Sequence, residues 1–160
     1  MQSRKEGTKK PQLLNKLEQT WVTFKASYAG LTDEQLVEPG VTGDWSVKDI
    51  LAHVSWWEEE ALKHLPHILQ GGWPPRYSVL YGGIDAFNAQ MTAQKRGLSL
   101  SAVLTQLDET HRRLVEYVQG VPEEQLSSET RFRRRLRSDT YGHYPIHTRA
   151  IREWRERSAW

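Results

Sequence analysis

Three histidines have the residue type and the spacing of a metal site. His143 and His147 are four residues apart, so on a helix they share one face. His53 precedes His143 by 90 residues, and the same offset aligns the two halves of the chain. Three imidazoles with an open fourth position are a known arrangement for a catalytic metal. We therefore predict that these side chains bind one divalent ion, for which zinc, nickel and Fe(II) are all suitable.

Each of these histidines also has a plainer interpretation. His53 lies in the middle of an apolar helical stretch, where a lone histidine is commonly a hydrogen-bonded core residue. Pairs such as His143 and His147 also occur on ordinary exposed helices. The metal site is favoured because the repeat places His53 and His143 at equivalent positions of two packed helices. The remaining histidines lack a comparable partner, and we expect them at the surface or the rim: His64, His67 and His111.

The repeat becomes visible when the chain is aligned with itself at an offset of 90 residues. The first-half residues that find an identical partner are Leu14, Leu17, Thr20, Gly30, Glu34, Gln35, Leu36, Asp49 and His53. Chance would give roughly two or three identities at ordinary residue frequencies. The match indicates two duplicated helical hairpins, and the second helix of each carries the pattern Asp-x-x-x-His.

Length and composition limit the class of protein. A chain of 160 residues suits a single domain, which we expect over residues 11–160, after a flexible basic N-terminus at residues 1–10. No run is long and apolar enough to span a bilayer, and the charged N-terminus has no apolar stretch behind it, so we expect a cytoplasmic protein without a membrane partner. Cysteine is absent, which excludes thiolate ligands and cysteine nucleophiles.

Hydrophobic periodicity predicts an all-α protein. Apolar residues recur at helical spacing in four long segments, at about 12–29, 46–71, 99–119 and 141–156. A long crossover rich in glycine, proline and aromatic residues follows the second segment and contains a short helix at about 84–95. The stretch at 131–141 alternates apolar and charged residues, and we interpret it as a short extended piece or an irregular loop.

Capping residues define the predicted helix ends. Thr32 with Gln35 forms a capping box, Ser46 with Asp49 starts the second long helix, and Ser99 starts the third. Pro145 is compatible with the last helix only in its first turn, where a missing N–H is no loss. This constraint places His143 close to the helix start.

Several other side chains are candidates for the site. Tyr144 and Tyr81 could donate protons, and Trp57 occupies the position equivalent to His147. Four tryptophans line either a substrate cleft or the core: Trp45, Trp56, Trp57 and Trp73. Two aspartates are candidates to orient an imidazole, although helix capping explains the first equally well: Asp49 and Asp139. One charge run is expected to be a solvated face with at most one member turned inward: Glu58, Glu59 and Glu60.

A basic run offers a different class of function. Five positive charges surround Phe132, enough for phosphate contacts if all faced outward: Arg131, Arg133, Arg134, Arg135 and Arg137. The run has acidic neighbours at Glu129 and Asp139, and the 22 basic and 20 acidic residues of the chain are mostly interleaved, for a net charge of +2. We therefore do not expect nucleic acid as a partner.

Two segments resemble a known family. WSVKDILAHVSWWEEE at residues 45–60 and DTYGHYPIHTRAIREW at residues 139–154 are similar to DinB-like four-helix bundles, most closely the ClbS/DfsB-like branch. The resemblance spans residues 13–154. It implies an up-down-down-up bundle with a crossover between its second and third helices, and a divalent metal on His53, His143 and His147. Related bundles include transferases and isomerases that use a low-molecular-weight thiol, and proteins that open a strained ring to detoxify a genotoxin.

The expected function combines these observations. We expect a metal-dependent bundle that acts on a small electrophile or xenobiotic, as a hydrolase or a thiol S-transferase, in detoxification or stress resistance. An open coordination position would activate a bound water or thiol. The alternative is a non-catalytic bundle that binds a small molecule or nucleic acid and holds no metal. The sequence leaves a homodimer open.

Overall fold

A computed structural model of the chain describes residues 2–158, with side chains from residue 9 onward. Within this range the secondary structure is helical, apart from an isolated bridge between Thr42 and Trp45. The helices are α1 (Gln2–Ser27), α2 (Asp33–Leu36), α3 (Val47–Leu69), α4 (Tyr77–Leu80), α5 (Ile84–Lys95), α6 (Leu100–Gln119), α7 (Glu123–Leu126), α8 (Arg131–Asp139) and α9 (Tyr144–Ser158). The predicted all-α class is confirmed.

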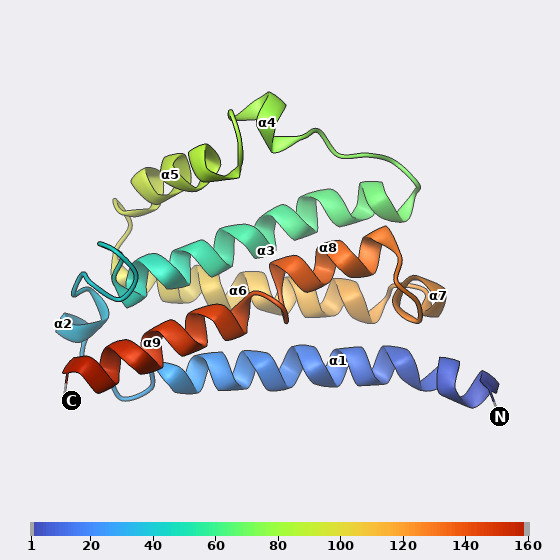
Figure 1. Cartoon of the computed structure of the whole chain (residues 1–160), viewed down its shortest axis with the longest axis horizontal. Coiled ribbons are helices and arrows are strands. Elements are labelled where there is room, and N and C mark those ends of the chain that lie inside the picture. The colour runs from blue at the N-terminus through green and yellow to red at the C-terminus, as the bar shows by residue number, and fades with distance from the viewer. Residues whose placement is uncertain (1, 159–160) are drawn as a thin grey trace.

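The long helices form a four-helix bundle (Figure 1). Helices α1, α3 and α6 are three of its members, and α8 and α9 follow each other along the fourth position. The first and fourth members run in one direction and α3 and α6 in the other, which is the predicted up-down-down-up course. The crossover with α4 and α5 lies outside the bundle, and α5 packs on α3.

Local sequence signals explain where the helices begin. The Ser46 hydroxyl accepts a hydrogen bond from the Asp49 backbone N–H, and the Asp49 carboxylate accepts one from the Ser46 backbone N–H. This capping box starts α3 as predicted. Ser99 accepts from the backbone N–H of Ala102 and starts α6. These caps satisfy N–H groups that have no partner inside the helix.

Two short helices are related to each other by the 90-residue offset. Helix α2 occupies residues 33–36 and α7 occupies residues 123–126, so each position of one corresponds to a position of the other. Each follows the first long helix of its half. Helix α8 breaks the correspondence, because the equivalent residues 41–49 form the loop before α3 and its first turn.

The core consists of two clusters along the bundle. One joins α1, α3, α6 and α9 around Phe24, Ile50, Leu107 and Ile151. The other joins α1, α3, α6, α7 and α8. The site described below lies among residues of the first cluster.

The prediction for residues 131–141 was wrong, because most of this stretch is helix α8. Phe132 and Leu136, four residues apart, are both fully buried, as expected for one face of a helix. Thr130 caps the helix by accepting from the Arg133 backbone N–H. The arginines between these two residues made the pattern look alternating, although its apolar members also fit a helical period.

The N-terminal helix is longer than predicted. Helix α1 begins at Gln2 and contains Pro11, whereas the periodicity predicted a start at about residue 12. The flexibility of residues 1–10 stays a prediction, and residue 1 lies outside the described residues. Among the helices described, none combines the length and the apolar character that a membrane span requires.

Candidate metal centre

Helices α3 and α9 position the three histidines. His53 lies in the second turn of α3, His143 directly precedes α9, and His147 lies one turn further on. Pro145 is the second residue of α9, where its missing N–H costs no helical hydrogen bond, as predicted. Residues 140–143 form a turn between α8 and α9, so His143 and His147 lie at the start of a helix.

The Nε2 atoms of the three imidazoles converge. His143 Nε2 lies 3.0 Å from His53 Nε2 and 2.9 Å from His147 Nε2. One ligand nitrogen from each of the three rings lies within 4.8 Å of the others. The structure therefore brings together all three residues that the sequence analysis selected.

These short contacts favour a shared cation over hydrogen bonds. A ring nitrogen carries either one proton or one lone pair, so His143 Nε2 can form a well-directed hydrogen bond with only one of its two neighbours. A metal ion removes the conflict, because all three nitrogens then direct lone pairs toward it. Around a tetrahedral zinc at 2.0–2.1 Å the nitrogens are about 3.3 Å apart, so the two short contacts of His143 Nε2 would lengthen by a few tenths of an ångström.

Burial keeps the three imidazoles neutral. It lowers the pKa of His53 to about 2, with the neighbouring His143 and His147 adding to the effect. It also lowers the pKa of His143 to about 4 and, together with His143, the pKa of His147 to about 3. Neutral imidazole is the form that ligates a metal.

Aromatic rings surround His53. The centroids of Trp45 and Trp56 lie 4.8 Å and 4.9 Å from the centroid of the His53 ring. The Nδ1 atoms of His53 and His143 are buried and have no hydrogen-bond partner among the described residues. Among the described residues, these two rings thus lack the carboxylate or carbonyl that many metal sites place on the second ring nitrogen.

The two aspartates have other roles in the structure. Asp49 caps α3 and pairs with Arg96. Asp139 accepts a hydrogen bond of 2.7 Å from Arg135 Nε. Over residues 9–158, no described hydrogen bond joins either carboxylate to a histidine, so neither orients an imidazole as the sequence analysis considered.

The other candidate residues lie in different surroundings. Trp57 Nε1 donates to Asn88 Oδ1 at 3.0 Å, and its ring packs on Phe87. Tyr81 also packs on Phe87, so both rings belong to the contact between α3 and the crossover. Trp73 is 78% exposed, with the guanidinium carbon of a neighbouring arginine 3.6 Å from its ring centroid, so it lines no core.

The structure contains a buried polar cluster that was not predicted from the sequence, and two histidines lie elsewhere than predicted. His111 and His64 were expected at the surface or the rim but are buried, with 7% and 3% exposed. His111 Nδ1 lies 2.9 Å from the carboxylate of Glu58, which is fully buried and also accepts a hydrogen bond from the Tyr144 hydroxyl. Glu58 is thus the inward-facing member of its charge run. The sequence repeat contained one indication that His111 is buried, because the 90-residue offset pairs His111 with Trp21 of the core.

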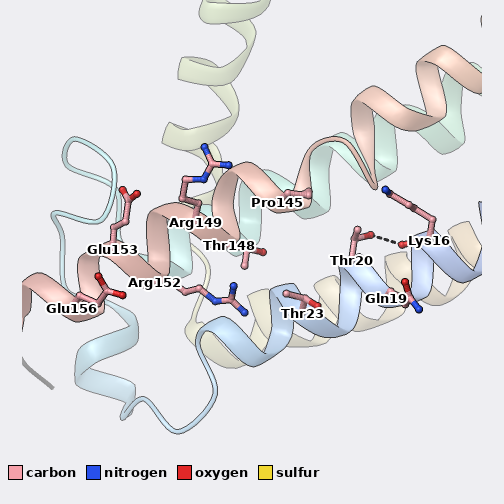
Figure 2. Close-up of a pocket in the computed structure, with 10 residues that line it drawn as sticks. All are labelled: Lys16, Gln19, Thr20, Thr23, Pro145, Thr148, Arg149, Arg152, Glu153 and Glu156. Carbon is pink, nitrogen blue, oxygen red and sulfur yellow. Dashed lines mark hydrogen bonds between the residues drawn. The ribbon is translucent and has the colours of Figure 1, made fainter.

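A groove runs along the other side of α9 (Figure 2). It has a volume of about 650 Å³ and lies between α1 and α9, with Pro145 and Thr148 on its α9 side. Figure 2 shows Arg152 reaching from α9 toward Thr23 of α1. None of the three histidines lines it, so the groove and the histidine cluster use different faces of the same helix.

Comparison with known proteins identifies the family. The family model of the DinB superfamily matches residues 16–149, a range that reaches from α1 into α9 and contains all three histidines. No curated protein and no solved structure gives a match. The match covers most of the chain and agrees with the helical bundle, so the chain belongs to the DinB superfamily.

Proposed function

We propose that this DinB-superfamily bundle binds one divalent transition metal through His53, His143 and His147 and is a metal-dependent enzyme. The convergence of three neutral Nε2 atoms on one point carries the proposal. An ion held there would supply a Lewis acid that lowers the pKa of a water or thiol at its open position. The rings of Trp45 and Trp56 would exclude bulk water from the His53 side of the site.

We further propose a small electrophile or xenobiotic as the substrate, with hydrolysis or thiol transfer as the reaction. The support is the resemblance of residues 45–60 and 139–154 to the ClbS/DfsB-like branch, together with the aromatic surroundings of His53. A role in detoxification, and a low-molecular-weight thiol as cosubstrate, belong to the same proposal.

The arrangement of α8 favours this proposal over nucleic-acid binding. Arg137 pairs with Glu129, Arg135 pairs with Asp139, and Arg131 lies over the ring of Trp73. These guanidinium groups already have partners within the fold, which weakens the case for a row of phosphate contacts.

Metal analysis of the untagged protein tests the proposed site. After incubation with zinc, nickel or Fe(II) and gel filtration, we expect about one equivalent of metal per chain. His53→Ala, His143→Ala and His147→Ala should each weaken binding by more than about 100-fold, beyond the loss expected from removing a supporting hydrogen bond. His67→Ala is the matched control, because His67 is exposed. Equal metal content in all variants would refute the site.

A second assay tests the reaction. The metal-loaded protein is incubated with styrene oxide, a small strained-ring electrophile, with and without added cysteine as a low-molecular-weight thiol. Product formation that needs both the metal and His147 would support the enzyme, and the thiol dependence separates hydrolysis from transfer. If the parent protein and the His147→Ala protein form product at the same rate, the proposed enzyme activity is contradicted.

A further inference from the structure

A buried hydrogen-bonded chain links three helices close to the histidine cluster. Glu58 of α3 is fully buried, and its Oε2 accepts the hydrogen bond of the Tyr144 hydroxyl from α9. The same oxygen lies 2.9 Å from Nδ1 of His111 on α6. Burying a carboxylate is costly unless donors compensate it. A polar cluster of this kind in an otherwise apolar core calls for an explanation.

The members of this chain adjoin the candidate ligands in sequence. Tyr144 directly follows His143 and precedes His147 by less than one turn, and Glu58 lies little more than one turn after His53 on α3. The helices α3 and α9 are thus linked twice by polar side chains, once through the imidazoles and once through Glu58 and Tyr144. A rotation of α9 about its axis would disturb both links together.

The start of α9 is held by backbone hydrogen bonds from His143 and Tyr144 to the Thr140 carbonyl and by side-chain contacts with the neighbouring helices. Thr140, between α8 and α9, has φ −132° and ψ −104°, so the backbone does not continue from one helix into the next. Helix α9 packs mainly on α1 and reaches α3 at few positions. The Tyr144 ring rests on Trp21 and Phe24 of α1, while its hydroxyl reaches across to α3. Tyr144 therefore contacts both neighbours of α9 from a single residue.

Burial affects the protonation of both partners. Burial raises the pKa of the Tyr144 hydroxyl well above its usual value, with the nearby Glu58 adding to the effect, so the hydroxyl stays a donor. Burial also raises the pKa of Glu58, although the bonds from His111 and Tyr144 oppose the shift.

We infer that Glu58 and Tyr144 are positioning residues: their hydrogen bond fixes the rotation of α9, so that Nε2 of His143 and Nε2 of His147 meet Nε2 of His53. This inference rests on the proposed metal site. The Glu58 carboxylate thus orients the ligating histidines and takes no part in the reaction at the metal.

Cobalt binding provides the first test. Tyr144→Phe removes only the hydroxyl and keeps the ring against α1. We expect Co²⁺ to bind about 10- to 100-fold more weakly than to the parent protein, with a changed visible absorption spectrum. Tyr28→Phe is the matched control, because Tyr28 is also a buried tyrosine but its hydroxyl has no partner among the described residues. Unchanged affinity and spectrum in Tyr144→Phe would overturn the inference.

Two substitutions of Glu58 separate hydrogen bonding from charge. Glu58→Gln keeps an oxygen that accepts from Tyr144 but removes the charge, whereas Glu58→Asp keeps the charge on a shorter side chain that withdraws from Tyr144. A positioning role predicts that Glu58→Gln binds Co²⁺ more tightly than Glu58→Asp. The reverse order would show that the charge matters and would overturn the inference.

Histidine NMR spectra of the metal-free protein keep the test independent of metal binding. Long-range ¹H–¹⁵N spectra report the environment of each imidazole ring. We expect Tyr144→Phe to shift the ring signals of His143 and His147, and Tyr28→Phe to leave them in place. If the parent protein binds no cobalt, the proposed metal function fails, yet these spectra still decide the positioning role. Unchanged ring signals in Tyr144→Phe would refute it.

Discussion

The rings of Trp21 and His111 stack with centroids 3.6 Å apart and planes 5° from parallel, and the two residues are 90 positions apart in the chain. His53 and His143 have the same separation and are also in contact. In a pseudo-twofold arrangement, a residue that touches its own equivalent lies near the symmetry axis. If such an axis relates the two halves of this chain, both pairs lie near it, and so does the candidate metal centre.

The first prediction concerns this axis. When a crystal structure of the protein is superposed on itself so that α1 to α3 overlie α6 to α9, the Cα atom of His53 should fall near that of His143. Trp21 and His111 should exchange places in the same operation. Halves that fail to superpose would make the sequence repeat a coincidence.

A crystal structure of the zinc-loaded protein gives the second prediction. The Nε2 atoms of His53, His143 and His147 should lie about 2.0–2.2 Å from one ion, with at least one position left for water or substrate. The two short nitrogen contacts should then lengthen from 3.0 Å and 2.9 Å to about 3.3 Å. Zinc bound elsewhere, with the contacts unchanged, would argue against the site.

The third prediction is a pH effect on the metal-free protein. Burial lowers the pKa of His147 from 6.5 to about 3. Below pH 6.5, His147 is therefore protonated in the unfolded state and still neutral in the folded state. Stability is therefore lost as the pH falls from 6.5 toward 3. When the pH is lowered from 7.5 to 5.5, the free energy of unfolding should fall in both proteins by different amounts. The fall should be about 1.4 kcal/mol smaller in His147→Gln than in the parent protein.

Urea unfolding at the two pH values measures this difference. Asp139 acts in the opposite sense, because burial raises its pKa to about 6 and folding then favours its protonated form. That contribution is common to both proteins and cancels in the comparison. Parallel pH profiles of the two proteins would contradict the assigned burial of His147.

The fourth prediction tests helix α8. Phe132 is fully buried, so Phe132→Ala should reduce the free energy of unfolding by about 3–5 kcal/mol, because it leaves a cavity in the core. Arg134→Ser on the same helix changes an exposed side chain and should stay within about 0.5 kcal/mol of the parent. Chemical denaturation measures both. Similar small effects would mean that residues 131–139 do not pack as this helix.

The predictable features of the fold are those with local causes. Ser46 and Ser99 mark helix starts through hydrogen bonds to backbone groups three residues away, and such caps are visible in the sequence. Pro145 limits where α9 begins for an equally local reason. The histidine cluster was predictable because a four-residue spacing and a chain repeat both pointed to the same residues.

The features that escaped prediction depend on contacts between distant segments. Glu58 and His111 look like surface residues in the sequence, and only the packing of α3 against α6 makes them buried partners. Trp73 looks like a core residue, but the crossover that carries it lies outside the bundle. In α8, five arginines obscured the helical spacing of Phe132 and Leu136.

The interruption at residues 140–143 has an electrostatic consequence. If α8 continued into α9 as one helix, His143 and His147 would lie in its interior, where the peptide dipoles of successive turns cancel. The break instead gives α9 its own N-terminus at these two histidines, where the Thr140 carbonyl at the end of α8 offsets part of the positive charge of the helix end. That charge disfavours protonated imidazole and favours an adjacent anion by about 0.3–1 kcal/mol. The bend in the fourth member of the bundle thus biases its two histidines toward the neutral state and toward negatively charged ligands.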